Sequence, residues 1–172
     1  MKKLVILVRG PSGCGKSTHV EFLKRAYLHP RTGKRNIVIC STDNFFIHFA
    51  GKDGDGKFLY RYAFDPTKLS EAHQDCYGRF LDALKNSNDK TVVIVDNTFI
   101  KKWEYENYVK AVELAGATIL IHEFRAQTFE TVKTLAARNV HKVPAEVILR
   151  QCYDFEPDEN AKIIPIPLEG EK

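Results

Sequence analysis

A glycine-rich segment near the start of the chain has residue types and spacing suited to chemistry. Residues 10–18 read Gly-Pro-Ser-Gly-Cys-Gly-Lys-Ser-Thr, follow an apolar run at 4–8 and precede a segment that favours a helix. Glycines allow backbone angles that turn successive N–H groups toward an anion, and a helix N-terminus adds further unpaired N–H groups. In such a phosphate-binding loop (P-loop), Lys16 reaches the β- and γ-phosphates and the Ser17 hydroxyl binds Mg²⁺. We therefore predict a nucleoside triphosphate site made by Gly10, Ser12, Gly13, Cys14, Gly15, Lys16, Ser17 and Thr18.

Two aspartates follow apolar runs that read as strands. Asp43 comes shortly after the run at 36–40, where a carboxylate could take the proton of a hydroxyl that attacks the γ-phosphate. A simple helix-capping or turn aspartate is the alternative for Asp43. Asp96 ends the run at 91–95, in the position of an acid that holds Mg²⁺ directly or through water. For Asp96 the alternative is again a turn residue.

Cationic residues gather at the end of one expected helix and in the turn that leads to the next, late in the chain. They are Arg138, His141 and Lys142. Phosphoryl transfer gains from positive charge that closes over the γ-phosphate, and a mobile lid is one way to supply it. A solvated cation at a helix C-terminus is the alternative, and we prefer it for Lys142.

The elements that must position these residues alternate between strands and helices. Such alternation predicts an α/β fold with a parallel sheet, and ligands of such sheets bind at the carboxyl ends of the strands. We expect four strands, at 4–8, 36–40, 91–95 and 118–124, and a possible short edge strand at 163–166. We expect helices at 17–28, 66–85, 101–114, 127–139 and 144–153.

The segment 47–65 contains three glycines and no clear periodicity. We expect it to be irregular, a mobile loop near the substrate. Aromatic residues in and beside it could stack a base, although aromatic side chains near a core more often pack. These residues are Phe45, Phe46, Phe49, Tyr60 and Tyr62.

Length and composition indicate an ordinary globular domain. The chain has 172 residues, 44% of them hydrophobic, and a net charge of +4, which ATP binding alone would explain. Its four cysteines are far apart in sequence, which argues against a zinc site or a disulfide framework and favours a reducing compartment. The apolar run at 4–8 is too short for a signal peptide or a membrane span. We expect an intracellular protein, cytoplasmic or, in a eukaryote, nuclear, without membrane association; its oligomeric state stays open.

Several short motifs occur in this order in one known group of enzymes. They are Ser-Thr-Asp-Asn-Phe-Phe at 41–46, Tyr-Ala-Phe-Asp-Pro at 62–66, Glu-Ala-His at 71–73, Val-Asp-Asn-Thr at 95–98 and Ala-Arg-Asn-Val-His at 137–141. With the P-loop, they make residues 4–155 similar to the P-loop kinases related to phage polynucleotide 5′-hydroxyl kinase. Within that group the sequence most resembles the small animal ATP-binding proteins named for binding a HECT-type ubiquitin ligase.

This resemblance implies an adenylate-kinase-like core of four parallel strands with a helical lid. It implies one P-loop kinase domain over residues 1–172, with the lid at about 126–144 and a tail at about 155–172. ATP and Mg²⁺ are the implied cofactors. By position, Asp43 matches the general base and Arg138 the first lid arginine, which contacts ATP phosphates. Lys16 and Ser17 keep the usual phosphate and magnesium roles.

The sequence departs from the family pattern in three places, and the first and third concern the identity of the acceptor more than the binding of ATP. The phage enzyme has an arginine, used on the acceptor's phosphate, where this sequence has Phe46. The usual Asp-Asn-Thr-Asn ends here in Phe99. The lid turn is shorter, so that a second lid arginine has no clear counterpart.

Three functions are compatible with the sequence. The leading hypothesis is an ATP- and Mg²⁺-dependent kinase for the 5′-hydroxyl of a DNA or RNA end. In it Asp43 is the base, Lys16 and Arg138 stabilise the moving phosphoryl group, and Ser17 with Asp96 holds the metal. The second is a kinase of a nucleoside, a nucleotide, a hydroxylated DNA base or a small metabolite. The third is an ATP-binding switch or adaptor without turnover.

Overall fold

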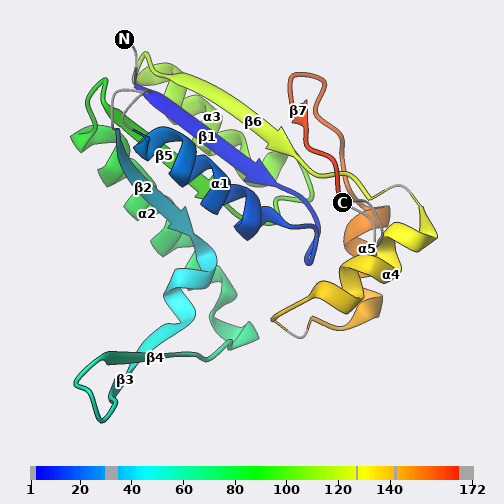
Figure 1. Cartoon of the computed structure of the whole chain (residues 1–172). Helices are drawn as coiled ribbons and strands as arrows, with labels where there is room; N and C mark the ends of the chain where they lie inside the picture. Colours follow the sequence, from blue (N-terminus) through cyan, green and yellow to red (C-terminus); the bar gives the residue numbers. More distant parts are fainter. Residues whose placement is uncertain (1–2, 30–34, 127, 142, 167–172) are drawn as a thin grey trace.

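A five-stranded parallel sheet forms the centre of the protein (Figure 1). The computed structural model describes residues 3–29, 35–126, 128–141 and 143–166. The strands lie in the order β2-β5-β1-β6-β7, and every pairing between them is parallel. Their bounds are β1 (Leu4–Arg9), β2 (Asn36–Ser41), β5 (Thr91–Asp96), β6 (Thr118–Glu123) and β7 (Lys162–Ile163). The expected α/β P-loop fold is confirmed, with the short edge strand as its fifth member.

Helices cover both faces of this sheet, because the strand side chains alternate between two apolar clusters. In β1, Val5 and Leu7 face α2 and α3, whereas Ile6 and Val8 face α1, α4 and α5. The helices are α1 (Lys16–Leu28), α2 (Leu69–Asn86), α3 (Trp103–Leu114), α4 (Phe129–Arg138) and α5 (Ala145–Tyr153). The residues buried in α2 recur every fourth position, as an amphipathic helix requires, and are Ala72, Cys76, Phe80 and Leu84.

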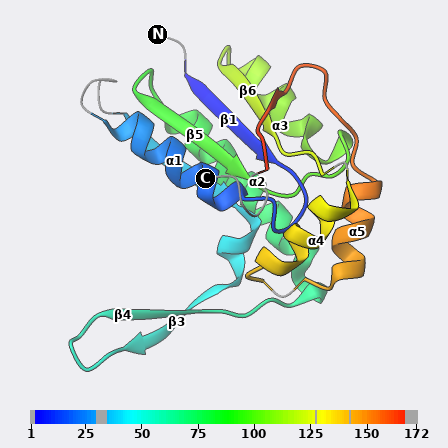
Figure 2. The same cartoon turned by 45° about the vertical axis from the view of Figure 1, so that its right-hand side comes forward.

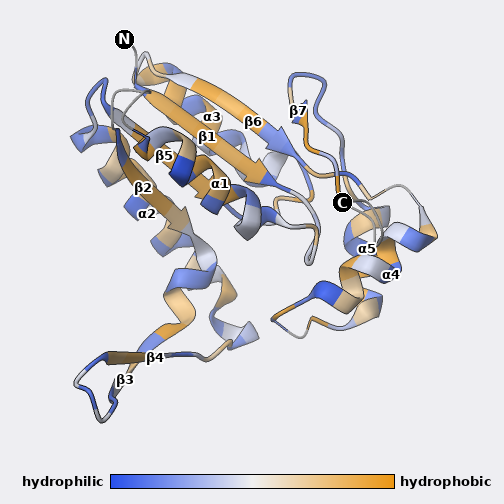
Figure 3. Cartoon of the chain, in the orientation of Figure 1, coloured by the Kyte–Doolittle hydropathy of each residue, from blue (hydrophilic) through white to orange (hydrophobic). Residues whose placement is uncertain are grey.

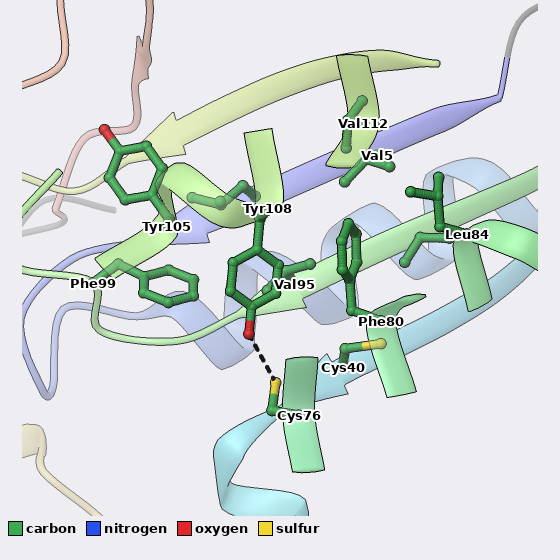
Figure 4. Close-up of a cluster of buried hydrophobic side chains, with 12 residues drawn as sticks. Val5, Cys40, Cys76, Phe80, Leu84, Val95, Phe99, Tyr105, Tyr108 and Val112 are labelled. Carbon is green, nitrogen blue, oxygen red and sulfur yellow. Dashed lines mark hydrogen bonds between the residues drawn. The ribbon is translucent and has the colours of Figure 1, made fainter. Parts of the chain in front are cut away.

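The cluster between the sheet and helices α2 and α3 combines aliphatic, aromatic and thiol side chains (Figure 4). Phe80 and Tyr108 pack with their ring centres 4.8 Å apart, and the Tyr108 hydroxyl lies 3.7 Å from Cys76 Sγ. The cysteines at 14, 40, 76 and 152 are free thiols. Apolar residues are concentrated on the sheet strands, as β1 and β6 show (Figure 3). Within the described residues, no helix has the length and apolar character to cross a bilayer.

A β-hairpin projects from the body of the molecule between β2 and α2 (Figures 1 and 2). Its strands β3 (Ile47–Lys52) and β4 (Phe58–Tyr62) are antiparallel, so the prediction of an irregular loop over 47–65 is wrong. The turn is closed by Asp53, whose Oδ1 accepts the backbone N–H groups of Asp55 and Lys57 at 3.0 and 2.8 Å. Gly51 has φ of 113° at a register shift in β3, a conformation that glycine adopts most readily.

Candidate active site

The P-loop connects the carboxyl end of β1 to the first turn of α1. Two of its glycines are required by close contacts. A Cβ on Gly13 would lie 2.1 Å from the carbonyl oxygen of Leu135 in α4, and one on Gly10 would lie 2.7 Å from Cβ of Phe124. The N–H of Gly10 donates to the Thr98 carbonyl at 2.9 Å, which joins the loop to the segment after β5. The loop is therefore fixed between the ends of two strands and the backbone of α4.

Lys16 folds back over the loop that precedes it. Its Nζ donates to the carbonyl oxygens of Gly10 and Pro11, each at 2.9 Å. The N–H of Ser12 donates to Oε1 of Gln151 at 2.9 Å, which links the loop to α5. Burial raises the pKa of the Cys14 thiol, so Cys14 serves as a neutral packing residue inside the loop. Ser17 and Thr18 are exposed in the first turn of α1.

Asp96 ends β5 beside the P-loop and is aligned with Val8 of β1 and Ser41 of β2. The pKa of its carboxyl is raised to about 6, chiefly by burial, with Lys16 lowering it and the charge of Asp43 raising it. Because Val8 of β1 and Ser41 of β2 both align with Asp96, the residues that follow these strands, Lys16 and Asp43, lie on the same edge of the sheet as Asp96, as predicted for the carboxyl ends of parallel strands. Their chemical roles stay predictions.

Asp43 lies in a 3₁₀ helix, η2 (Thr42–Phe46), directly after β2. The side chain of Asn97 holds this helix against the end of β5, since its Oδ1 accepts the Thr42 N–H at 2.8 Å. The Ser41 hydroxyl caps the helix by accepting the Asp43 N–H at 3.3 Å. The backbone around the carboxylate is thus positioned by two neighbouring strands, although Asp43 itself is half-buried.

Two side chains from distant segments flank the Asp43 carboxylate. The Tyr62 hydroxyl, from the hairpin, donates to Oδ1 at 2.9 Å, and Nε2 of His141, from the turn after α4, lies 3.6 Å from Oδ2. The Tyr62 and His141 rings are themselves in contact, with centres 4.7 Å apart. Burial and the neighbouring Asp43 charge raise the pKa of Tyr62, so its hydroxyl remains a hydrogen-bond donor. We call these three residues the Asp43 cluster.

Sequence reasoning did not connect Tyr62 or His141 to Asp43, nor Gln151 to the P-loop. The only available signal was that Tyr62 and His141 fall in motifs shared with the family. Arg138 lies in the last turn of α4, exposed and three residues before His141. Its contact with ATP phosphates stays a prediction. Lys142 lies outside the described residues.

Phe46 is buried and cannot stack on a base, which corrects that part of the sequence interpretation. It is 2% exposed, and its ring packs against Phe45, Tyr62 and Phe64 with ring centres 5.3, 6.2 and 5.0 Å away. The residue that replaces the expected acceptor arginine therefore supports the base of the hairpin.

Phe99, the second departure from the family pattern, has φ of 41°. Asparagine adopts this left-handed conformation more readily than phenylalanine, which gives the family's asparagine a backbone role. Here the Phe99 ring is buried against Tyr105 and Tyr108, and its carbonyl accepts Nε of Arg9 at 2.9 Å. Packing and this hydrogen bond offset the backbone strain.

A second polar cluster, which we call the Arg9 cluster, lies at the ends of β1 and β6. It was not predicted from the sequence. It consists of Arg9, Tyr105, Glu123, Arg125 and Asp158. Arg9 and Glu123 are paired at 2.9 Å with both side chains fully buried. They are cross-strand neighbours at the ends of β1 and β6, so opposite charges at equivalent strand ends were the available signal. The Arg9 guanidinium also lies 4.3 Å from the centre of the Phe155 ring.

The residues at this edge fit MgATP. The N-terminus of α1, which begins directly after the P-loop, suits phosphate oxygens, and Lys16 adds a positive charge. Mg²⁺ prefers oxygen ligands and keeps several waters, so the Ser17 hydroxyl and the Asp96 carboxylate form a suitable pair. In the described part of the chain, no group of three or more His, Cys, Asp or Glu side chains could hold a metal ion. Mg²⁺ at such sites generally takes its other ligands from substrate phosphates and water.

Known proteins resemble this chain over most of its length. A family model described as an AAA domain (AAA_33) matches residues 5–157. NEDD4-binding protein 2 of Homo sapiens is 30% identical over 153 residues, which make up 89% of this chain and 8% of that protein. The chain thus spans only a small part of this relative's length.

Solved P-loop structures share the fold at low sequence identity. Kti12 of Chaetomium thermophilum, in complex with ADP-AlF3, has a TM-score of 0.59 at 12% identity and covers 94% of this chain and 88% of its own. The APS kinase CysC of Mycobacterium tuberculosis, in complex with AMPPNP and APS, has a TM-score of 0.58 at 15% identity, covering 95% and 88%. Together with the family match over residues 5–157, these comparisons show that the chain belongs to the AAA_33 family of P-loop kinase domains.

Proposed function

We propose that this protein is an ATP- and Mg²⁺-dependent kinase that transfers the γ-phosphate to a hydroxyl, and that its acceptor is the 5′-hydroxyl of a DNA or RNA end. The observation that carries the proposal is the position of Asp43. Its carboxylate lies on the same sheet edge as Lys16 and Asp96 and is held by Tyr62. A general base must lie within reach of both the phosphate site and the acceptor, and this edge offers that geometry.

Each residue has one task in the proposed transfer. The P-loop N–H groups and Lys16 bind the β- and γ-phosphates, and Arg138 adds positive charge over the γ-phosphate. Ser17 and Asp96 would hold Mg²⁺, which would supply positive charge to neutralise the charge on the phosphates. Asp43 accepts the proton of the acceptor hydroxyl as its oxygen bonds to the γ-phosphorus. The bond from that phosphorus to the β–γ bridging oxygen breaks, and ADP leaves.

We further propose that residues 126–144 form the lid of a single kinase domain over 1–172. His141 lies beside Asp43, and Arg138 is one turn earlier on α4. Closure of this segment would bring positive charge over the phosphates and exclude water. The similarity to NEDD4-binding protein 2, at 30% identity, agrees with the group of animal ATP-binding proteins to which the sequence motifs point.

One observation favours a small-molecule acceptor as the second candidate. The position where the phage enzyme has its acceptor arginine is the buried Phe46, so this contact to an acceptor phosphate is missing from that position. A nucleoside or a metabolite without a phosphate would need no such contact.

The test is transfer of label from γ-labelled ATP with Mg²⁺. The acceptors are 5′-hydroxyl DNA, 5′-hydroxyl RNA, free nucleosides and nucleoside monophosphates, offered in parallel to the wild type and to Asp43→Asn. Label on oligonucleotide 5′ ends that is lost in Asp43→Asn supports the proposal. Label only on a small acceptor contradicts the polynucleotide assignment. Absence of transfer to every acceptor, with ATP still bound, favours a switch or adaptor.

A further inference from the structure

The projecting hairpin carries a row of aromatic side chains along one face. Tyr62, Tyr60 and Phe58 alternate along β4, so they point to the same side, and Phe49 is the cross-strand partner of Tyr60. The Phe49 ring contacts both neighbours, with ring centres 6.2 Å from Tyr60 and 5.8 Å from Phe58. We call these four residues the aromatic row.

The aromatic row is exposed over its outer part. Phe49, Phe58 and Tyr60 are 60%, 56% and 65% exposed, whereas ordinary aromatic residues of a folded domain are largely buried. Contiguous exposed rings on one side of a two-stranded sheet mark a binding surface more often than a packing accident.

The inner end of the row is part of the Asp43 cluster. Tyr62 donates its hydroxyl to the Asp43 carboxylate at 2.9 Å, and the remaining rings follow outward along β4. Successive same-face residues of a strand are about 6.6–6.8 Å apart, so three of them span about 13 Å. A chain molecule with its end at Asp43 could therefore lie along the row.

The charges on the hairpin strands fit a polyanion. Neither β3 nor β4 carries an acidic residue, and Lys52, as the cross-strand partner of Phe58, lies on the face of the aromatic row, whereas Arg61 and its partner His48 lie on the opposite face. The Lys52 ammonium lies 4.7 Å from the centre of the Phe58 ring, so a cation accompanies the outermost ring. The carboxylate of Asp53 in the turn is engaged by two backbone N–H groups. Rings for bases and cations for phosphates are the two components of single-strand binding surfaces.

We propose that the aromatic row binds the bases of a single-stranded nucleic acid whose 5′ end reaches Asp43. The inference rests on the proposed function, which it makes more specific. The rings stack on successive bases without reading their sequence, and Lys52, the cross-strand partner of Phe58, contacts a backbone phosphate. The acceptor is then a single-stranded end several nucleotides long, and the hairpin takes over the task of the acceptor arginine missing at Phe46.

Binding can be measured without turnover. The probes are fluorescent twelve-nucleotide single strands, one DNA and one RNA, with a 5′-phosphate so that they cannot be phosphorylated. Anisotropy titrations compare the wild type with Phe49→Ala, Phe58→Ala and Tyr60→Ala. Since the loss of a ring removes one stacked base, we expect each variant to bind about 10-fold more weakly. A double-stranded probe with blunt ends should bind less tightly than the single strands.

Matched controls separate stacking from general effects. Phe49→Leu keeps an apolar side chain but no ring, and should weaken binding as Phe49→Ala does. Trp103→Ala removes a 71% exposed aromatic residue on α3, outside the hairpin, and should leave oligonucleotide affinity unchanged. ATP affinity and melting temperature should be unchanged in all variants, because the substituted side chains are exposed and outside the P-loop.

The outcomes distinguish this inference from the proposed function. Transfer to oligonucleotides of two to twelve residues should become more efficient with length in the wild type, and less so in Phe49→Ala. Oligonucleotide phosphorylation that depends on Asp43 but is unaffected by the hairpin variants overturns the inference and keeps the function. Row-dependent oligonucleotide binding without any transfer overturns the function alone. A wild-type dimer that becomes monomeric in Phe49→Ala, with no effect on oligonucleotide binding, assigns the row to a second copy of the chain and overturns the inference.

Discussion

The Asp43 cluster and the Arg9 cluster use the same three chemical groups in different surroundings. Each combines a carboxylate, a tyrosine hydroxyl that donates to an aspartate, and a positively charged or chargeable side chain. In the Arg9 cluster the Arg9–Glu123 pair is fully buried, and Tyr105 donates to Asp158 at 2.7 Å. In the Asp43 cluster the side chains of His141 and Asp43 are 38% and 50% exposed, and Nε2 of His141 lies 3.6 Å from Oδ2 of Asp43.

The two clusters differ in how deeply they are buried and in which segments of the chain they connect, and these differences decide what each cluster can do. The Arg9 cluster joins the end of β1 to β6 and to the segment before β7, and each of its polar groups has protein partners. It has no capacity left for a ligand. The Asp43 cluster joins η2 to the hairpin and the turn after α4, and its carboxylate remains accessible. Similar groups thus stabilise the fold in one place and are available for chemistry in the other.

Removing the charge of Glu123 should have the largest effect on stability. Glu123→Gln leaves Arg9 charged and buried without a counterion, which should lower the free energy of unfolding by about 3–5 kcal/mol. Urea denaturation measures this loss. Asp75→Asn, which breaks an exposed pair with Arg79, is the control and should change stability by less than about 1 kcal/mol. A small loss in Glu123→Gln would mean that the buried cluster is not structural.

Asp43→Asn should show the opposite pattern. We expect transfer to fall by about 10²–10⁴-fold, since the general base is lost, while unfolding free energy and ATP affinity stay close to wild type. Label transfer, urea denaturation and nucleotide titration measure the three quantities. If Asp43→Asn unfolds as readily as Glu123→Gln, the distinction between the clusters is wrong.

The two tyrosines offer a smaller and more direct comparison. Tyr105→Phe leaves a buried oxygen of Asp158 without its donor and should cost about 1–3 kcal/mol of stability. Tyr62→Phe removes one half-exposed hydrogen bond, and should cost little stability but slow transfer by about 2- to 10-fold because Asp43 is less well oriented. Thermal melts of both variants measure the loss of stability, and transfer rates measure the loss of activity. Equal stability losses would contradict the contrast in burial.

Lowering the pH should reduce the contribution of the Arg9 cluster to the free energy of unfolding, and this effect should be smaller than those of the substitutions above. Burial favours the neutral form of Asp158, but hydrogen bonds from Tyr105 and from the Asn160 N–H outweigh it and hold the pKa of this carboxyl below its ordinary value of 3.8. The bonds to ionised Asp158 therefore stabilise the fold above pH 3.8, and this contribution is lost as the pH falls through the lower folded-state pKa. Unfolding free energy measured from pH 6 down to pH 3 should decline less steeply in Asp158→Asn than in wild type. Parallel profiles would refute this assignment.

The sequence predicted the elements that have a continuous apolar signature. Buried runs at 4–8 and 91–95 marked central strands, and the P-loop followed from glycine and lysine spacing. The hairpin was missed because both of its faces are largely exposed, so no core-facing pattern distinguishes it from a loop. Its Asp53–Gly56 turn was the local signal. The Arg9 cluster was missed because an arginine in a strand reads as an interruption until its partner on β6 is known.

Tyr62 and His141 could not be assigned to Asp43 from sequence for a different reason. They come from segments 19 and 98 residues away along the chain, one in the hairpin and one after α4. Only the folded arrangement shows that these segments meet. Strand order, by contrast, places Asp96 beside the P-loop as soon as a parallel sheet is assumed.

The contact between Gly13 and Leu135 has a mechanical consequence. Since a Cβ at position 13 would lie 2.1 Å from the Leu135 carbonyl oxygen, the backbones of the P-loop and α4 touch with no side chain between them. Helix α4 cannot move closer to the loop at this point. Any rotation of α4 must instead pivot about Leu135, so that Arg138, three residues away, moves little while the start of the helix at Phe129 moves further.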